Sequence, residues 1–149
     1  MGRVMTAANI RVLLCHDHEV LRSGLASLLG AAEGFEVVAT AAEGVEGVEA
    51  TVRTHPDVVL MDLAMPKIDA LDVTRQIAAL TPPSSVLLLT GFPHRGRIRA
   101  ALEAGASGWV LKDATPPELL SAVRAAAGRA LPSPGADAGA PPARARASR

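Results

Sequence analysis

The sequence predicts an α/β protein in which a parallel sheet is covered by helices on both faces. Short apolar runs alternate five times with segments whose apolar residues recur at helical spacing. The apolar runs are nearly continuous, which is typical of parallel strands buried on both faces. Because a closed barrel of this type needs eight strand–helix units, five units predict an open sheet with right-handed crossovers.

The first two strand–helix units lie before Pro56. The aliphatic run at 10–15 predicts a strand, and apolar residues at helical spacing over 20–29 predict the helix after it. Residues 35–39 supply the second strand, and valines three and four residues apart at 45–52 predict the second helix. This helix must end just before Pro56, since proline disfavours helical backbone at the preceding residue.

Three further strand–helix units complete the pattern. The last helix has the clearest start, because Thr115 is suited to cap a helix and Pro116 and Pro117 are suited to its first turn. The expected strands are 58–61, 86–89 and 109–111, and the expected helices are about 71–80, 97–103 and 116–127.

Length and composition predict one folded domain with a polar tail. With 149 residues and 49% hydrophobic content, the chain is long enough for one proper core. From Pro132 onward the sequence is Pro, Ala, Gly, Ser and Arg without periodicity, which cannot bury enough apolar area to offset its ordering entropy. We expect an N-terminal extension at 1–9, a folded domain at 10–129 and a flexible linker or tail at 130–149.

The charge distribution argues against nucleic-acid binding by the folded domain. The formal net charge is zero, but four arginines and one aspartate give residues 129–149 a charge of +3, which leaves −3 on residues 1–128. Binding to nucleic acid depends on clustered Lys and Arg that neutralise phosphates. A mildly acidic domain lacks that feature.

The single cysteine and the apolar segments predict a cytoplasmic protein. Cys15 excludes an intrachain disulfide, and its place in an apolar strand predicts a small buried side chain. The first nine residues lack the apolar segment of a secretory signal, and no apolar stretch approaches the roughly 20 residues of a membrane span. We expect no membrane association.

Polar residues follow several of the expected strands at the point where each strand ends. Asp62 follows the third strand directly, Asp17 follows the first, Thr90 the fourth and Lys112 the fifth. In open α/β sheets, ligands bind beyond the carboxyl ends of the strands. Two carboxylates, a hydroxyl and an ammonium at this edge suit magnesium and phosphate.

Six ordered stretches contain these strand-end residues and their neighbours. They are IRVLL at 10–14, DH at 17–18, LRSGL at 21–25, DVVLMDLAMP at 57–66, LLLT at 87–90 and GASGWVLKD at 105–113. Together they resemble the receiver domains of bacterial two-component response regulators, most closely the NarL/FixJ (LuxR-type) branch. The resemblance covers about residues 10–130. It implies a flavodoxin-like (CheY-like) three-layer sandwich with strand order 2-1-3-4-5 and five helices.

The resemblance also implies roles for the strand-end residues. Asp62 would accept a phosphoryl group from a sensor histidine kinase and become an aspartyl phosphate. A magnesium ion held by Asp17, Asp62 and the main-chain carbonyl of Ala64 would neutralise the charge. Lys112 and the Thr90 hydroxyl would contact phosphoryl oxygens.

The same resemblance implies a conformational switch. Thr90 would shift toward the phosphoryl group, and the aromatic side chain of Trp109 would pack inward, which would remodel the surface around the fourth helix and fifth strand. Trp109 is equally suited to plain core packing. Phosphorylation can shift the equilibrium between the inactive and active states by no more than the difference in free energy of the phosphate contacts in those two states. We therefore expect partial activity without phosphate.

His16 departs from the family pattern, which usually has an acid at this position. A neutral imidazole removes one negative charge from the site, so we predict weaker magnesium binding and less magnesium-efficient phosphorylation of Asp62. We also expect phosphorylation to decline below neutral pH. Magnesium titrations of the wild type and His16→Asp would test this prediction, and identical curves would remove it.

Other functions fit the residues less well. Magnesium-dependent phosphohydrolases carry an acid two residues after the nucleophile, whereas this chain has Ala64 there, so we expect a switch rather than a turnover enzyme. A nucleotide binder would need a Gly, Ser or Thr cradle after the first strand, where this chain has His16 to Glu19. A receiver that works without phosphorylation, through a ligand or a protein partner, stays open because of His16.

The resemblance implies partners and an output. The NarL/FixJ branch usually joins its receiver through a short linker to a helix-turn-helix domain, so the expected output is transcription through a DNA-binding domain absent from this chain. The sequence does not decide between a fragment of a longer regulator and a stand-alone receiver. A homodimer formed near the first and fifth or the fourth and fifth helices is compatible with small residues of the last helix such as Ala122, Ala125 and Ala126.

Overall fold

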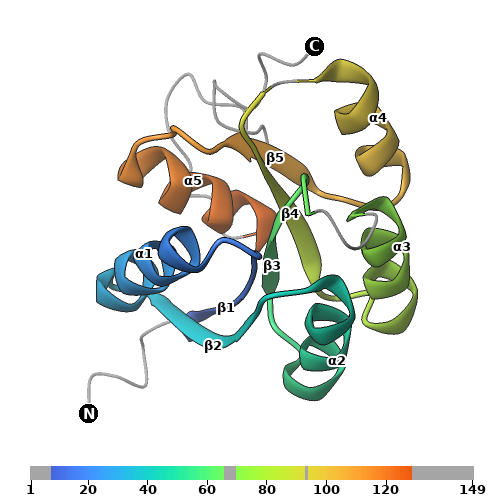
Figure 1. The fold of residues 1–149 in the computed structure, drawn as a ribbon. Coiled ribbons are helices and arrows are strands. Elements are labelled where there is room, and N and C mark those ends of the chain that lie inside the picture. Colours follow the sequence, from blue (N-terminus) through green and yellow to red (C-terminus); the bar gives the residue numbers. More distant parts are fainter. Residues whose placement is uncertain (1–7, 66–69, 93, 129–149) are drawn as a thin grey trace.

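The computed structural model describes residues 8–65, 70–92 and 94–128. Along these residues, five strands and five helices alternate in the predicted order (Figure 1). None of the described helices is both long and apolar enough to cross a membrane. Apart from Ala8 and Asn9, the extension predicted at 1–9 and the tail predicted at 130–149 lie outside the described residues. The elements are β1 (Ile10–Cys15), α1 (Glu19–Ala31), β2 (Phe35–Ala41), α2 (Gly44–Thr54), β3 (Val58–Asp62), α3 (Ala70–Leu80), β4 (Ser85–Thr90), α4 (Arg95–Glu103), β5 (Gly108–Leu111) and α5 (Pro116–Ala126).

The five strands form one parallel sheet of order β2-β1-β3-β4-β5, as the family resemblance implied. Predicted and observed element ends differ by at most two residues. The difference that matters for function is in β3, which includes Asp62 rather than ending before it. Asp62 pairs with Leu89 of β4, so its backbone is fixed by the sheet.

Two apolar cores fill the two faces of the sheet. Because successive side chains of a strand point to opposite faces, Leu13 and Val59 lie in the core beneath α2, α3 and α4, whereas Leu14 and Leu60 lie in the core beneath α1 and α5. Figure 1 shows these two helical layers on either side of the sheet. All four side chains are fully buried, which explains why the apolar runs of the sequence are continuous.

Helix α2 approaches the end of β1 closely at a glycine. A Cβ atom on Gly47 would lie 2.7 Å from the Cys15 Sγ atom, so only glycine fits without a shift. Cys15 is buried, as predicted. Burial raises the pKa of its thiol to about 12, with a further contribution from the Glu46 carboxylate, so this cysteine stays a neutral packing residue.

The start of α5 follows the sequence prediction. The Thr115 hydroxyl accepts a hydrogen bond from the Glu118 N–H at 3.3 Å, and the Glu118 carboxylate accepts one from the Thr115 N–H at 2.8 Å. Pro116 and Pro117 occupy the first turn, where a missing N–H leaves no hydrogen bond unmade. This capping box fixes the entry of α5 five residues after β5.

At the amino ends of the strands, polar side chains are bonded to neighbouring backbone. The Arg11 Nη1 group donates to the Thr54 carbonyl at 2.7 Å, and the Arg11 backbone N–H donates to the Asp57 Oδ2 atom at 2.9 Å. The Ser84 hydroxyl donates to the Pro56 carbonyl at 2.6 Å. These bonds attach the α2–β3 and α3–β4 connections to the sheet.

Candidate functional site

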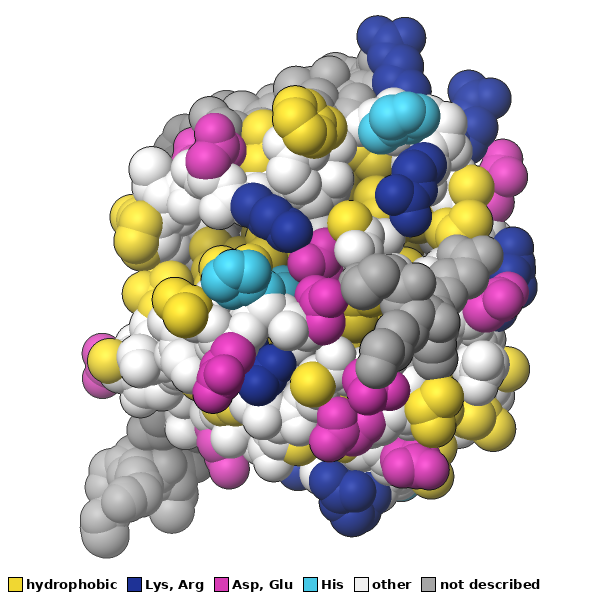
Figure 2. All heavy atoms as spheres, viewed as in Figure 1, with side chains coloured by type: hydrophobic (Ala, Val, Ile, Leu, Met, Phe, Trp, Pro, Cys, Tyr) yellow, Lys and Arg dark blue, Asp and Glu magenta, His cyan; other side chains and the backbone are white. Residues whose placement is uncertain are grey.

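The carboxyl ends of the strands bring together side chains from distant parts of the chain. His16 directly follows β1, Asp62 ends β3, Thr90 ends β4 and Lys112 directly follows β5. In the view of Figure 2, acidic, basic and histidine side chains gather near the middle of the face. The sheet order places β1 beside β3, so the segments that carry Asp62 and His16 are neighbours.

Asp62 is buried and has two short polar contacts. Its side chain is 3% exposed. The Ala64 N–H donates to the Oδ1 atom at 2.9 Å, and the Lys112 Nζ atom lies 3.0 Å from the Oδ2 atom. Since a carboxylate offers about four lone-pair positions, two contacts leave room for further ligands.

These contacts keep Asp62 ionised. Burial by itself raises the pKa of this carboxyl, but its contacts with His16, the Ala64 N–H and the Lys112 ammonium outweigh burial and lower the pKa to about 2. The His16 Nδ1 atom is 3.8 Å from the Asp62 Oδ2 atom, which is too long for a hydrogen bond. We therefore assign the lowered pKa mainly to Ala64 and Lys112. At neutral pH, Asp62 is therefore an anion.

His16 is buried beside this anion. Its exposed fraction is 0%, and within the described part of the chain neither ring nitrogen has a hydrogen-bond partner. Its backbone carbonyl accepts a hydrogen bond from the Arg22 Nη1 group at 2.7 Å, which fixes the backbone after β1. Buried polar groups without partners are rare in native proteins and call for a physical explanation.

The predicted metal ligands fit a magnesium ion in part. Asp17 lies two residues after β1 and Ala64 two residues after the buried Asp62, both residues are exposed, and carboxylate and carbonyl oxygens are the donors that magnesium prefers. The His16 nitrogens do not belong to that donor type. Among the described residues, no three His, Cys, Asp or Glu side chains are arranged around one point that suits a metal.

Thr90 lies at the expected strand end, but its hydroxyl is turned to its own loop. It donates to the Phe92 carbonyl at 2.7 Å and accepts a weaker bond from the Phe92 N–H at 3.3 Å. The single hydroxyl proton is therefore used within the β4–α4 turn and not at Asp62. Phe92 itself is 78% exposed.

Trp109 is already packed inward. It is 3% exposed and belongs to the same core as Ile98 and Ala101 of α4. The plain packing role weighed above for this residue is therefore present.

His18 and Arg97 have contacts that concern the site indirectly. His18 is the N-cap of α1, and its Nδ1 atom accepts a hydrogen bond from the Leu21 N–H at 3.1 Å. Arg97 is exposed, but its Nη2 group donates to the Leu63 carbonyl at 2.9 Å and so ties α4 to the residue after Asp62. No pattern in the sequence predicts this bond, because basic residues at the start of a helix are usually solvated.

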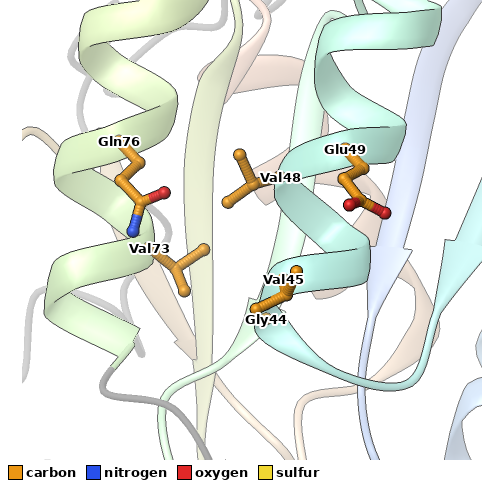
Figure 3. A pocket seen from close by; sticks show the side chains of 6 residues that line it. All are labelled: Gly44, Val45, Val48, Glu49, Val73 and Gln76. Carbon is orange, nitrogen blue, oxygen red and sulfur yellow. The ribbon is translucent and has the colours of Figure 1, made fainter.

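A shallow apolar hollow lies away from these strand-end residues, between α2 and α3. Figure 3 shows Val48 and Val73 facing each other across it from the two helices. It includes none of the strand-end residues described above, so its position does not identify the site of chemistry. The lining residues are Gly44, Val45, Val48, Glu49, Val73 and Gln76.

Comparison with known proteins gives the family. The model of the response regulator receiver domain matches residues 12–124, which is well over half of the chain. The chain belongs to the response regulator receiver domain family. The predicted family and strand order are therefore confirmed.

The curated relatives that this receiver matches include transcriptional regulatory proteins of the NarL/LuxR branch. The chain is 41% identical over 117 residues to the transcriptional regulatory protein LiaR of Bacillus subtilis, covering 78% of this chain and 56% of that protein. It is 39% identical over 116 residues to the oxygen regulatory protein NreC of Staphylococcus aureus, covering 77% of this chain and 54% of that protein. The chain thus spans about half the length of these relatives.

Solved structures agree with the fold. The receiver domain of the putative response regulator NarL from Mycobacterium tuberculosis is 31% identical with a TM-score of 0.77, and the match covers 81% of this chain and 98% of that one. Its agreement supports a receiver of the NarL type. A receiver that works without phosphorylation is not favoured by these relatives.

Proposed function

We propose that this receiver is a phosphorylation-dependent switch in which Asp62 accepts a phosphoryl group from a sensor histidine kinase and controls a transcriptional output. The observation that carries the proposal is the buried, ionised Asp62 carboxylate with the Lys112 ammonium 3.0 Å from its Oδ2 atom. A buried anion kept ready beside a cation, at the carboxyl edge of a parallel sheet, is suited to nucleophilic attack.

In the proposed transfer, an Asp62 oxygen attacks the phosphorus atom of a phosphohistidine. A P–O bond forms, the P–N bond breaks, and the imidazole of the kinase leaves with the electron pair. Lys112 remains beside the carboxylate and stabilises the negative charge that the phosphoryl oxygens bring. A divalent cation, when bound by Asp62 and Asp17, supplies further charge neutralisation.

In this proposal, the conformational switch depends on movement of Thr90 rather than of Trp109. For the Thr90 hydroxyl to bind a phosphoryl oxygen, its 2.7 Å bond to the Phe92 carbonyl must open, so phosphorylation pulls on the β4–α4 turn. Trp109 is already buried in the core that includes Ile98 and Ala101 of α4, and it needs no inward movement. The bond from Arg97 to the Leu63 carbonyl gives α4 a second connection to the phosphorylated strand end.

The proposal treats the domain as a switch and not as a turnover enzyme. Ala64 has no side chain that can act as a general acid or activate water beside Asp62. Output through DNA is proposed for a partner domain like those of the longer relatives, which this chain matches over about half their length. A homodimer through the surface near α4 and α5 is one way in which the altered α4 would be read.

Intact mass spectrometry tests the proposal. The protein is incubated with a small-molecule phosphodonor, first with magnesium and then with manganese. Addition of one phosphoryl group is expected in the wild type and in Asp113→Asn, which changes an exposed acid next to Lys112. Asp62→Asn should show no adduct. The proposal is wrong if the wild type stays unmodified with both cations, or if Asp62→Asn is modified to the same extent.

A further inference from the structure

We infer that His16 is a metal ligand, and that the site at Asp62 therefore favours divalent ions that accept nitrogen donors, such as cobalt and zinc, over magnesium. The inference rests on the proposed function in one respect, because the ion would serve the same Asp62 carboxylate. It goes beyond that function by naming the ligand and the class of ion.

The unpartnered ring of His16 is the first observation. The side chain is completely buried, and neither nitrogen has a hydrogen-bond partner in the described part of the chain. A buried imidazole without partners costs free energy, and an ion or ordered ligand at the site removes that cost. With its proton on Nε2, the ring offers the Nδ1 lone pair to a cation.

The position of Nδ1 is the second observation. It lies 3.8 Å from the Asp62 Oδ2 atom. At tetrahedral geometry, two bonds of about 2 Å from one ion set the nitrogen and the oxygen about 3.3 Å apart, so the two atoms must approach by roughly 0.5 Å for one ion to bind both. The separation is too long for a hydrogen bond, and a shift of that size would bring both atoms to one ion.

The chemistry of the donors selects the ion. Imidazole nitrogen suits cobalt, nickel and zinc, whereas magnesium prefers oxygen. Lys112 also lies beside Oδ2, and no third His, Cys, Asp or Glu side chain completes a cluster among the described residues. Water and oxygen donors would fill the remaining positions, so we expect modest affinity and a clear preference rather than tight binding.

Imidazole nitrogen resonances test ligation with His16 itself unchanged. The expected result, on titrating zinc into the full chain without phosphodonor, is a large shift of the His16 Nδ1 resonance that is lost in Asp62→Asn. His18, which caps α1 through its own Nδ1, is the internal control, and its resonance should move less. If the His16 resonances do not change at zinc levels that saturate the protein, the inference is overturned.

Calorimetric affinities for cobalt and magnesium test the preference. The ratio of cobalt affinity to magnesium affinity should fall at least about tenfold in His16→Asp, because the nitrogen donor is replaced by oxygen. His18→Asn keeps a capping side chain and should leave the ratio unchanged. His16→Gln serves as a second variant if His16→Asp does not fold. An unchanged ratio in folded variants contradicts the inference.

These measurements separate the inference from the proposed function. If His16 ligates zinc but no phosphoryl adduct forms on Asp62, only the proposed function fails. If the adduct forms while the His16 resonances stay unchanged with zinc, only the inference fails.

Discussion

The two ends of the sheet use their polar side chains in different ways. At the amino ends, Arg11, Asp57 and Ser84 bond to backbone groups at 2.6 to 2.9 Å and hold the connections in place. At the carboxyl ends, the buried Asp62 contacts Lys112, while the buried His16 has no hydrogen-bond partner among the described residues. The same sheet thus has one end whose polar groups are bonded within the fold and one end with capacity left for a ligand.

This difference separates stability from function. A polar group that is fully bonded within the fold contributes to the free energy of unfolding and has little left for binding. A charged pair with unfilled lone pairs keeps capacity for chemistry even where it also contributes to stability. We therefore expect substitutions at the amino ends to change stability without changing phosphorylation, and substitutions at the carboxyl ends to change phosphorylation.

The largest expected effect is at Lys112. Lys112→Ala removes the cation from the Asp62 carboxylate and from the incoming phosphoryl oxygens, so the rate of adduct formation should fall roughly 100-fold. Rates from intact mass at a fixed phosphodonor concentration measure this effect. Arg95→Ala changes an exposed cation on α4 and is the matched control. If Lys112→Ala forms the adduct at a rate within about threefold of the wild-type rate, Lys112 does not stabilise the transfer.

The second effect is acid destabilisation through Asp62. Its folded-state pKa is about 2, below the ordinary value of 3.8, so its contribution to stability is present above about pH 4 and is lost as the pH falls through 2. From the pKa shift alone, the loss in free energy of unfolding is roughly 2 kcal/mol. Chemical unfolding at pH 5 and pH 2 should show this loss in the wild type and not in Asp62→Asn. Equal losses in both proteins would contradict the assignment.

A smaller effect is expected at the amino ends. Ser84→Ala leaves the Pro56 carbonyl without its 2.6 Å hydrogen bond in a buried setting, which should lower the free energy of unfolding by about 1 kcal/mol. The rate of adduct formation on Asp62 should stay at the wild-type value. Denaturant unfolding and intact mass on the same preparation measure both quantities. If Ser84→Ala slows adduct formation and leaves the free energy of unfolding unchanged, the expected difference between the two ends of the sheet is wrong.

The sequence was sufficient for the elements and for the position of Asp62, Thr90 and Lys112 at strand ends, whereas the roles of these residues stay predictions. Continuous apolar runs located the five strands, and the ordered motifs gave the family and hence the strand order. The start of α5 at Thr115 could also be predicted, because its capping box depends on residues only three apart in the chain. These signals come from residues that are close together or regularly spaced in the chain, so they can be recognised without the tertiary structure, and these predictions are confirmed.

The contacts of individual side chains could not be predicted from the sequence. The stretch from His16 to Glu19 looks polar throughout, yet His16 is fully buried while its neighbours are exposed. The Thr90 hydroxyl bonds to Phe92, and Arg97 reaches the Leu63 carbonyl 34 residues away. Such contacts depend on how loops pack after the sheet has formed, and neither periodicity nor spacing encodes them.

The most direct measurement compares two aspartates at opposite ends of β3. Intact mass is recorded after phosphodonor treatment for Asp57→Asn, in which the amide oxygen can still accept the Arg11 N–H bond, and for Asp62→Asn. The account predicts a wild-type level of adduct in Asp57→Asn and none in Asp62→Asn. Loss of the adduct in Asp57→Asn together with its retention in Asp62→Asn would contradict it.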